Sequence, residues 1–173
     1  MPPQRCLFLL AATCIALSAA TPTGAEDAAT AVPLASITNA RGQLDLREYR
    51  GRVVYLDFWA SWCRPCRRSF EWMGTMHERY AQRGLVVLAV NVDRERSDAD
   101  RFLEKTQPPF RVVLDPEAVL ARAHDLEAMP SSFVYGTDGA LQHIHTGFRD
   151  GDGDLLEGVI TALLHRPDER TLQ

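Results

Sequence analysis

A continuous apolar run from Val53 to Ala60 constrains the fold more than any other part of this 173-residue chain. The run is interrupted only by Asp57 and is bounded by Gly51. Runs of this length are typical of a strand that is buried on both faces of a sheet. Because neither face of such a strand can be left to water, the run predicts the central strand of a layered α/β domain.

The remainder of the chain alternates between helical and strand patterns. Apolar residues recur at helical spacing over residues 66–84, which favours an amphipathic helix. A hairpin turn is expected at residues 137–139, and a last helix over Leu155–His165 should open with a capping box at residues 154–157. Ser97 is expected to cap a further helix. The element order β-α-β-α-β-α-β-β-α predicts a mixed central sheet with helices on both faces.

The N-terminus has the pattern of a secretory signal peptide. Arg5 is followed by an apolar run to about Ala20 and then by small residues. We expect an extracytoplasmic, periplasmic protein, tethered to the membrane if this segment is retained as an anchor. The expected organisation is a signal peptide or anchor at 1–25, a flexible tether at 26–33, a domain at 34–167 and a tail at 168–173.

Loss of this peptide would leave Cys63 and Cys66 as the only cysteines. Two thiols at this spacing can bind a metal, form an inert crosslink or exchange electrons. Closing so short a loop constrains the unfolded chain very little, and one Cys-x-x-Cys pair without a second is weak support for a zinc site. We therefore expect redox chemistry and no metal. The formal charge of −4 argues against nucleic acid as a partner.

The pair follows a buried strand and begins a helix, where backbone amides and the helix dipole stabilise a thiolate. Cys63 is expected at the N-cap with its sulfur exposed, as the nucleophile, and Cys66 should point toward the core as the resolving thiol. Pro65 suits the first turn because its missing amide proton is not needed there. The Cys63 thiolate would attack a partner's disulfide, and Cys66 would then resolve the mixed disulfide.

The segment VVYLDFWASWCRPC, residues 53–66, resembles the active-site segment of the thioredoxin family, and the export signal makes the chain similar to the TlpA/ResA branch of that family. The similarity covers most of residues 34–165. Met129–Pro130, followed by residues 131–133, resembles the cis-proline loop that lies beside the dithiol and pairs with the substrate backbone. The resemblance implies a thioredoxin-like α/β fold, with the branch's additional αβ unit within about residues 91–116.

The resemblance also implies that a carboxylate, Asp57, lies beneath Cys66. A carboxyl in an apolar strand should titrate high and can accept the Cys66 proton; the alternative is a structural carboxylate held by hydrogen bonds. Members of the branch usually carry a glutamate three residues after the second cysteine, where this chain has Ser69. Glu71 lies too far round the helix to replace it, so the chemistry should depend on Asp57 alone.

Charged and aromatic side chains surround the pair. Arg64 should stabilise the Cys63 thiolate and make the couple more oxidising, unless it is merely part of a solvated helix face. Arg67 and Arg68 are expected to be solvated, with Arg67 paired to Glu71. Trp62 is expected to shield the thiols and contact the partner protein.

The resemblance implies an exported thiol-disulfide oxidoreductase that reduces disulfides of specific proteins, such as apocytochrome c or a copper-site protein, through Cys63 and Cys66. It would act as a monomer, receive electrons from a membrane thiol transporter, and need no cofactor other than its own redox-active disulfide. One alternative is a disulfide-forming oxidase or isomerase. Another is a copper(I) chaperone that uses both thiolates beside Met129.

Overall fold

The computed structural model describes residues 44–166, which all belong to the unit formed by residues 31–173. The expected signal peptide, tether and C-terminal tail lie outside the described residues. None of the helices within residues 44–166 is both long and apolar enough to span a membrane. The elements follow in the order η2 (Leu46–Tyr49), β1 (Val53–Trp59), α1 (Arg64–Tyr80), η3 (Ala81–Arg83), β2 (Leu85–Asn91), α2 (Arg96–Thr106), β3 (Arg111–Leu114), α3 (Val119–Ala123), β4 (Ser131–Tyr135), β5 (Leu141–Thr146) and α4 (Asp152–Leu164).

Five strands form one mixed sheet in the order β3-β2-β1-β4-β5. Strand β1 pairs in parallel with β2 and antiparallel with β4, so the run predicted to be central lies at the middle of the sheet. Every residue of β1 and of β2 is buried. The predicted mixed sheet is therefore confirmed, and α2 and β3 occupy the segment predicted to hold the additional αβ unit.

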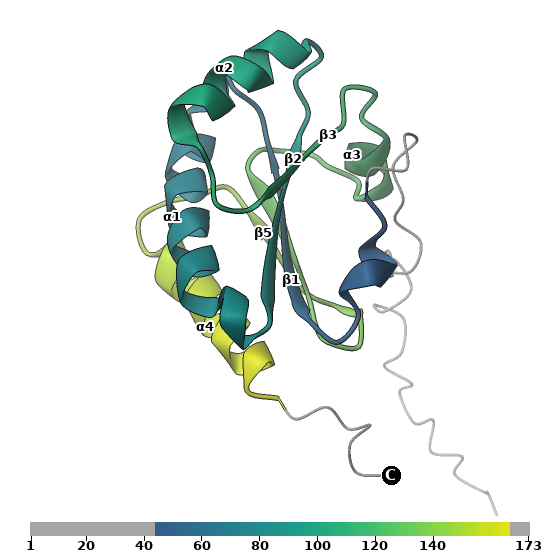
Figure 1. Cartoon of the computed structure of the whole chain (residues 1–173), viewed down its shortest axis with the longest axis vertical. Coiled ribbons are helices and arrows are strands. Elements are labelled where there is room, and N and C mark those ends of the chain that lie inside the picture. The colour runs from purple at the N-terminus through teal and green to yellow at the C-terminus, as the bar shows by residue number, and fades with distance from the viewer. Residues whose placement is uncertain (1–43, 167–173) are drawn as a thin grey trace, which may run out of the picture. The chain divides into compact units, whose positions relative to one another are not determined.

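Helices cover both faces of this sheet. Figure 1 shows α1 and α4 on one side and α3 with η2 on the other. Tyr55 and Trp59 pack in the core layer beneath α1 and α4, whereas Leu56 and Phe58 pack in the layer beneath η2 and α3. Because successive side chains of a strand point to opposite faces, Asp57 faces the same layer as Tyr55 and Trp59. This is the layer that contains both cysteines.

Helix α1 begins directly after Cys63 and ends at Tyr80, four residues before the predicted end at Gly84. Its buried stripe includes Cys66, Phe70 and Met73. The chain continues into η3 and leaves it at Gly84, whose φ of 104° is readily adopted only by glycine. The next residue begins β2, so the glycine turns the chain from the helix layer back into the sheet.

The predicted N-terminal caps of the two later helices are wrong. Helix α2 has Glu95 at its N-cap, and Ser97 lies inside the helix. Helix α4 begins at Asp152 after an N-cap at Gly151, three residues before the predicted start. Glu157, the expected second half of a capping box, lies within α4 and hydrogen-bonds with the Tyr80 hydroxyl of α1. The Glu157 side chain, which the local pattern assigned to a cap, therefore bonds to another helix instead.

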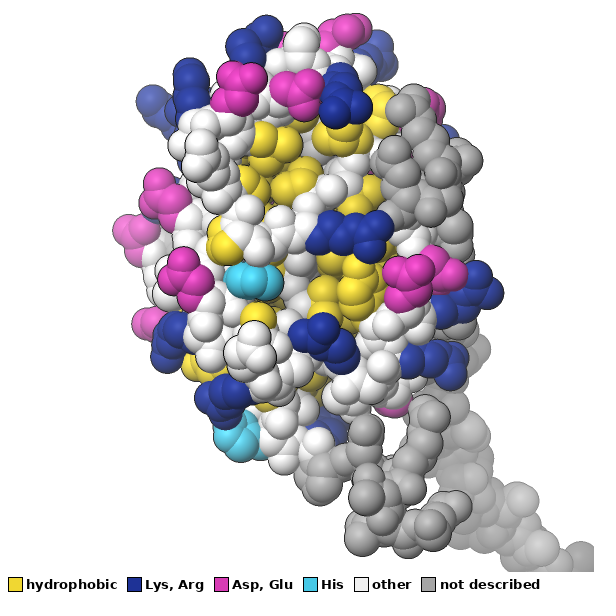
Figure 2. All heavy atoms as spheres, viewed as in Figure 1, with side chains coloured by type: hydrophobic (Ala, Val, Ile, Leu, Met, Phe, Trp, Pro, Cys, Tyr) yellow, Lys and Arg dark blue, Asp and Glu magenta, His cyan; other side chains and the backbone are white. Residues whose placement is uncertain are grey.

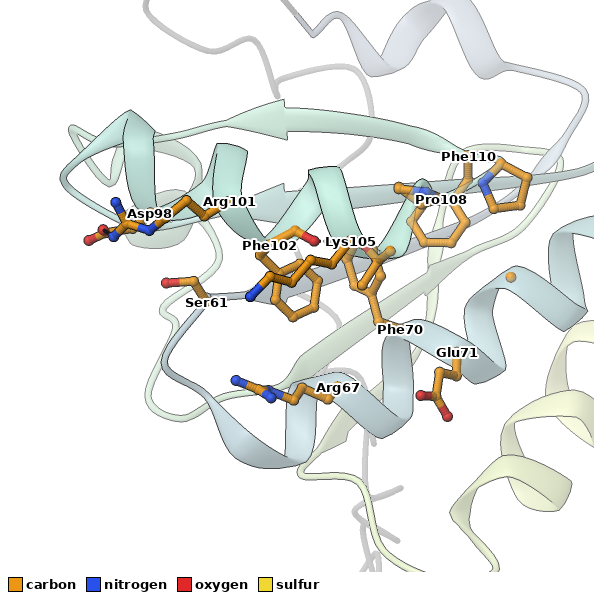
Figure 3. A pocket seen from close by; sticks show the side chains of 13 residues that line it. Ser61, Arg67, Phe70, Glu71, Asp98, Arg101, Phe102, Lys105, Pro108 and Phe110 are labelled. Atoms are coloured by element: carbon orange, nitrogen blue, oxygen red, sulfur yellow. Dashed lines mark hydrogen bonds and ion pairs between the residues drawn. The ribbon is translucent and has the colours of Figure 1, made fainter.

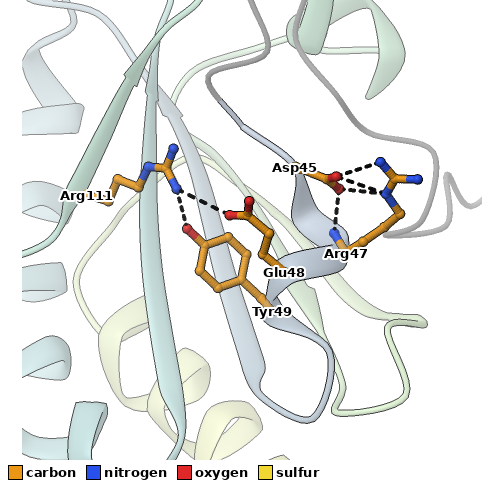
Figure 4. A network of polar contacts seen from close by, with 5 residues as sticks. All are labelled: Asp45, Arg47, Glu48, Tyr49 and Arg111. Carbon is orange, nitrogen blue, oxygen red and sulfur yellow. Dashed lines mark hydrogen bonds and ion pairs between the residues drawn. The ribbon is translucent and has the colours of Figure 1, made fainter.

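Polar contacts also fasten η2 to the sheet edge. Arg111 of β3 donates a hydrogen bond of 2.6 Å to the Tyr49 hydroxyl, and its guanidinium lies 4.0 Å from a Glu48 oxygen (Figure 4). Asp45 caps η2 by accepting from the backbone N–H of Arg47 and pairs with the Arg47 guanidinium.

In Figure 2, hydrophobic side chains are visible in the middle of one face of the molecule, with acidic and basic side chains around them.

Candidate active site

The two cysteines form a disulfide at the start of α1. Cys63 is the N-cap residue, and the Cα atoms of Cys63 and Cys66 are 5.3 Å apart. Pro65 lies in the first turn, as predicted. Cys66 is fully buried, whereas 5% of the Cys63 surface is exposed. The order of accessibility is the predicted one, but the Cys63 sulfur is less exposed than expected, because in the disulfide it is bonded to a buried partner and packs in the same core cluster.

The start of α1 is electrostatically suited to a thiolate. No acidic residue lies in the first turn of this 17-residue helix, and no side chain caps its N-terminal amides. These amides and the helix dipole therefore face Cys63 without a competing negative charge. When the disulfide is reduced, this arrangement favours ionisation of the Cys63 thiol over that of a thiol in water.

Asp57 is fully buried in the middle of β1. Burial raises the pKa of its carboxyl to about 7, and the hydrogen bond from Ser132 and the nearby Ser69 hydroxyl oppose that rise. Ser132 donates to Oδ1 over 2.7 Å, whereas Oδ2 accepts no hydrogen bond from any residue in the described range. A carboxyl with one unpartnered oxygen and a pKa near neutrality can accept a proton and release it.

Ser69 lies between this carboxyl and the backbone of Cys66. Its buried hydroxyl donates to the Cys66 carbonyl over 3.0 Å and lies close enough to Asp57 to influence the pKa of that group. The serine that stands where the branch usually has a glutamate therefore fills the space between Cys66 and Asp57 without adding a charge. The second acid is absent at this position, as the sequence indicated.

The cis-proline loop lies against the same strand. The Met129–Pro130 peptide bond is cis, as predicted, and Pro130 is buried. Strand β4 begins directly afterwards, and its register pairs Ser132 with Asp57. Met129 packs against the core cluster that includes both cysteines. The pairing of β4 with β1 thus brings the loop, the carboxyl and the dithiol into one region of the fold.

A family model for the Redoxin family matches residues 24–160, which is most of the chain. This chain belongs to the Redoxin family. It is 32% identical to the thiol-disulfide oxidoreductase ResA of Geobacillus kaustophilus over 102 residues, which are 59% of each chain, and 29% identical to ResA of Bacillus subtilis over 110 residues, 64% of this chain and 61% of that one. The matched region therefore spans less than two thirds of these relatives' length.

Solved structures confirm the thioredoxin-like fold of this Redoxin-family chain. A protein of Chlorobium tepidum assigned as thiol:disulfide interchange protein DsbE has a TM-score of 0.69 and 41% identity, covering 74% of this chain and 91% of that one. A thioredoxin-like protein of Neisseria meningitidis, with 22% identity and a TM-score of 0.66, covers 83% of this chain and 96% of that one. The second of these supports the fold alone.

The loop between β1 and α1 is held in place by Asp93, a residue that was not singled out from the sequence. Asp93, which is 4% exposed, accepts hydrogen bonds from the Ser61 backbone N–H (2.9 Å) and the Ser61 hydroxyl (3.1 Å). The Asn91 side chain donates to the same carboxylate over 2.8 Å. The signal for Asp93 in the sequence was the pair of polar residues, Asn91 and Asp93, at the end of a buried strand. Asp93 therefore fixes the loop two residues before Cys63.

The arginines around the dithiol differ in their environments. Arg64 is exposed beside the cysteines. Arg68 pairs with Asp150 and donates to the Phe148 carbonyl, so it ties α1 to the loop before α4. The predicted pair between Arg67 and Glu71 is absent among the described ion pairs, and Arg67 instead lines a pocket between α1 and α2 (Figure 3).

Trp62 lies on the surface immediately before Cys63. Its side chain is 70% exposed, the largest exposure of any large hydrophobic residue in the described part of the chain. Exposed aromatic side chains beside a reactive group commonly contact a partner, because they bury a large area on binding. This position agrees with the predicted contact to a partner protein, which stays a prediction.

Ser132→Ala is expected to raise the pKa of Asp57 further above 7. The variant removes the 2.7 Å hydrogen bond that stabilises the ionised carboxylate, and such bonds to a charged group contribute about 1.5 to 3 kcal/mol. The pKa should therefore rise by about one unit or more, as measured by the carbon NMR shift of the carboxyl group across a pH titration. Ser131→Ala is the matched control, because the Ser131 hydroxyl donates to the Ala128 carbonyl. Equal midpoints in the two variants would contradict the expectation.

Proposed function

We propose that this chain is an extracytoplasmic thiol-disulfide oxidoreductase that reduces disulfides of specific proteins. The observation that carries the proposal is the Cys63–Cys66 disulfide at the N-terminus of α1, placed in the same core layer as the proton-accepting carboxyl of Asp57. Similarity to proteins named as thiol-disulfide oxidoreductases and as a thiol:disulfide interchange protein supports it.

The proposed reaction starts from the reduced dithiol. The Cys63 thiolate attacks one sulfur of the substrate's disulfide, which breaks that bond and releases one substrate thiolate. Asp57 accepts the proton of Cys66, and the resulting thiolate attacks the Cys63 sulfur. The second substrate sulfur leaves as a thiolate, and the protein ends in the disulfide form seen in the structure. Two electrons have passed from the dithiol to the substrate.

We further propose that a membrane thiol transporter returns electrons to the oxidised protein. A reductase in an oxidising compartment would otherwise remain trapped as the disulfide. Candidate substrates are apocytochrome c and copper-site proteins, in which reduced thiols are needed before a cofactor or metal is bound. The exposed Trp62 and the cis-proline loop at Met129–Pro130 would contact the substrate backbone beside its disulfide.

The reduction potential of the Cys63–Cys66 couple tests the direction of electron flow. We expect a value near or below about −250 mV, in the range of thioredoxin-like reductants. The full chain with Cys6 and Cys14 replaced by serine would be equilibrated in glutathione and dithiothreitol buffers, and the free thiols of Cys63 and Cys66 trapped and counted. A value near about −120 mV would instead assign the chain as an oxidase, with Arg64 and the acid-free first turn of α1 stabilising the thiolate enough to reverse the direction.

A further inference from the structure

A groove opens between α1 and α2 beside the dithiol, and nothing in the proposed reaction uses it. It encloses about 750 Å³ and is lined by residues of both helices and of the segment between α2 and β3. Ser61, two residues before Cys63, and Arg67, one residue after Cys66, both line it. A molecule bound in this α1–α2 groove would therefore adjoin the loop that carries the nucleophile.

The floor of the α1–α2 groove is aromatic and closely packed. The ring of Phe70 lies edge-on to those of Phe102, at 5.1 Å, and Phe110, at 5.0 Å. Trp59, at the end of β1, packs against Phe70 and Phe102 at 4.8 and 4.7 Å. Phe70 and Phe110 are buried, and Phe102 is only partly covered. Of these rings, Phe102 therefore presents the most surface to an apolar side chain of a bound segment.

Basic side chains line the end of the groove nearest the dithiol. In Figure 3 the charged ends of Arg67 and Lys105 extend toward the same end, where Ser61 lies, and Glu71 lies toward the other end. Arg101 is paired with Asp98. Within residues 44–166, neither Arg67 nor Lys105 has an ion-pair partner. Two unpaired cations above an aromatic floor complement a carboxylate next to an apolar side chain.

The position of Arg67 sets the spacing of the matching acid. Arg67 lies four residues after Cys63 on α1, about 6 Å further along the helix axis. An extended segment advances about 3.3 Å per residue. An acid that reaches Arg67 and Lys105 should thus lie about two to four residues from the cysteine under attack, once the length of the side chains is included.

We propose that the α1–α2 groove binds an acidic and apolar segment of the protein substrate, next to the cysteine that Cys63 attacks. This inference rests on the proposed reductase function and names the class of substrate. It runs against the overall charge of −4, which by itself would favour a basic partner. The charge beside the groove determines which segment it prefers, because exposed charges beyond about 10 Å are largely screened at physiological salt.

Three peptides test the proposal, each used as a dimer linked by a single disulfide so that both sulfurs are equivalent. They share one sequence with an apolar residue beside the cysteine, and carry Asp, Asn or Lys three residues from it. The reduced full chain, with Cys6 and Cys14 replaced by serine, is mixed with each dimer, and peptide thiol release is followed by stopped flow. We expect the Asp peptide to react about three- to tenfold faster than the Asn peptide, and the Lys peptide to react slowest. The preference should shrink at about 0.5 M salt.

Charge reversal separates the groove from other causes. Lys105→Glu should abolish or invert the order of the Asp and Lys peptides. Arg122→Glu, a matched reversal of an exposed arginine on α3 at the other face of the sheet, should keep the original order. An unchanged preference in Lys105→Glu, or equal rates for all three peptides in the unaltered chain, would overturn the proposal.

A small neutral disulfide distinguishes this failure from failure of the proposed function. The reduced chain should also transfer its electrons to 2-hydroxyethyl disulfide, which has no segment to bind in the groove. Reduction of this compound with equal rates for the three peptides would refute the groove alone. No reduction of the compound or of any peptide would refute the reductase function, and the groove proposal with it.

Discussion

Asp57→Asn is expected to slow resolution of the mixed disulfide about 100-fold at pH 8. Asparagine keeps an oxygen that can accept the 2.7 Å hydrogen bond from Ser132, but it cannot accept the Cys66 proton. The unaltered chain should lose rate as the pH falls through about 7, because its carboxyl becomes protonated there. The variant should lack this inflection. Single-turnover release of a fluorescent thiol from a preformed Cys63 mixed disulfide measures the step.

The same substitution is expected to stabilise the oxidised protein at alkaline pH. Burial raises the pKa of Asp57 from 3.8 to about 7, so the folded chain keeps a proton that the unfolded chain releases between about pH 4 and pH 7. Stability is therefore lost as the pH rises through this window and stays low above it. Since each pKa unit is equivalent to about 1.4 kcal/mol, the loss is about 4 kcal/mol. Asparagine does not ionise, so the variant avoids this loss of stability.

Chemical denaturation at pH 4.5 and pH 8 tests this coupling of function to stability. The stability advantage of Asp57→Asn should be present at pH 8 and small at pH 4.5. Asp115→Asn is the matched control, because Asp115 is also buried but accepts hydrogen bonds from the backbone of Val119 and Ala121 in the first turn of α3. This control should be destabilised at pH 8 while resolution proceeds at the usual rate. A rate at pH 8 that Asp57→Asn leaves unchanged would refute the role as a base.

Cys66→Ser is expected to trap the substrate on Cys63. The first attack needs only the thiolate at the N-terminus of α1, whereas release needs the neighbouring thiol. Well-oriented intramolecular groups have effective concentrations of about 10⁵ M or more, far above any external thiol. Turnover should therefore fall by at least about a thousandfold, and a covalent adduct should accumulate that intact-mass spectrometry detects and dithiothreitol reverses.

Cys63→Ser is the counterpart of this experiment. With Cys6 and Cys14 also replaced by serine in both variants, it should form no adduct, because Cys66 is fully buried and cannot meet a protein substrate. The two variants have similar volumes and each removes the disulfide, so their difference reports the role of each sulfur rather than the loss of the crosslink. Adducts on Cys66 in the Cys63→Ser variant would reverse the proposed assignment of nucleophile and resolving thiol.

Local sequence patterns predicted the parts of the fold that depend on neighbouring residues. The run of Val53–Ala60, the chain reversal at Gly84 after the helical segment and the hairpin at residues 137–139 were predicted and are present, because burial on both faces, a left-handed glycine and a tight turn each leave a short-range signature. The caps at Ser97 and residues 154–157 were wrong. The preferences of such side chains for a cap are weak: Glu157 bonds to Tyr80 of another helix, and Ser97 lies inside α2, which begins one residue earlier.

In the candidate site, too, relations between neighbouring residues were predicted and contacts between distant residues were not. Cys63, Cys66 and Pro65 lie on one helix, so their relation follows from spacing alone. The Ser132 hydroxyl reaches Asp57 across 75 positions of the chain, and nothing in the local sequence of either residue indicates the contact. Asp93 was missed for the same reason, since its partner Ser61 precedes it by 32 positions.

The sequence by itself determined that two thiols begin a helix after a buried strand that contains one acid, because these features are encoded by contiguous residues. Only the tertiary structure decided what that acid and the surrounding cations do. The pairing of β4 with β1 set the hydrogen bonding of Asp57, and its burial set the pKa. Arg67 and Glu71 both line the groove between α1 and α2, and among the described ion pairs they are not paired with each other. Charge and proton affinity depend on distance in space, which the order of residues does not specify.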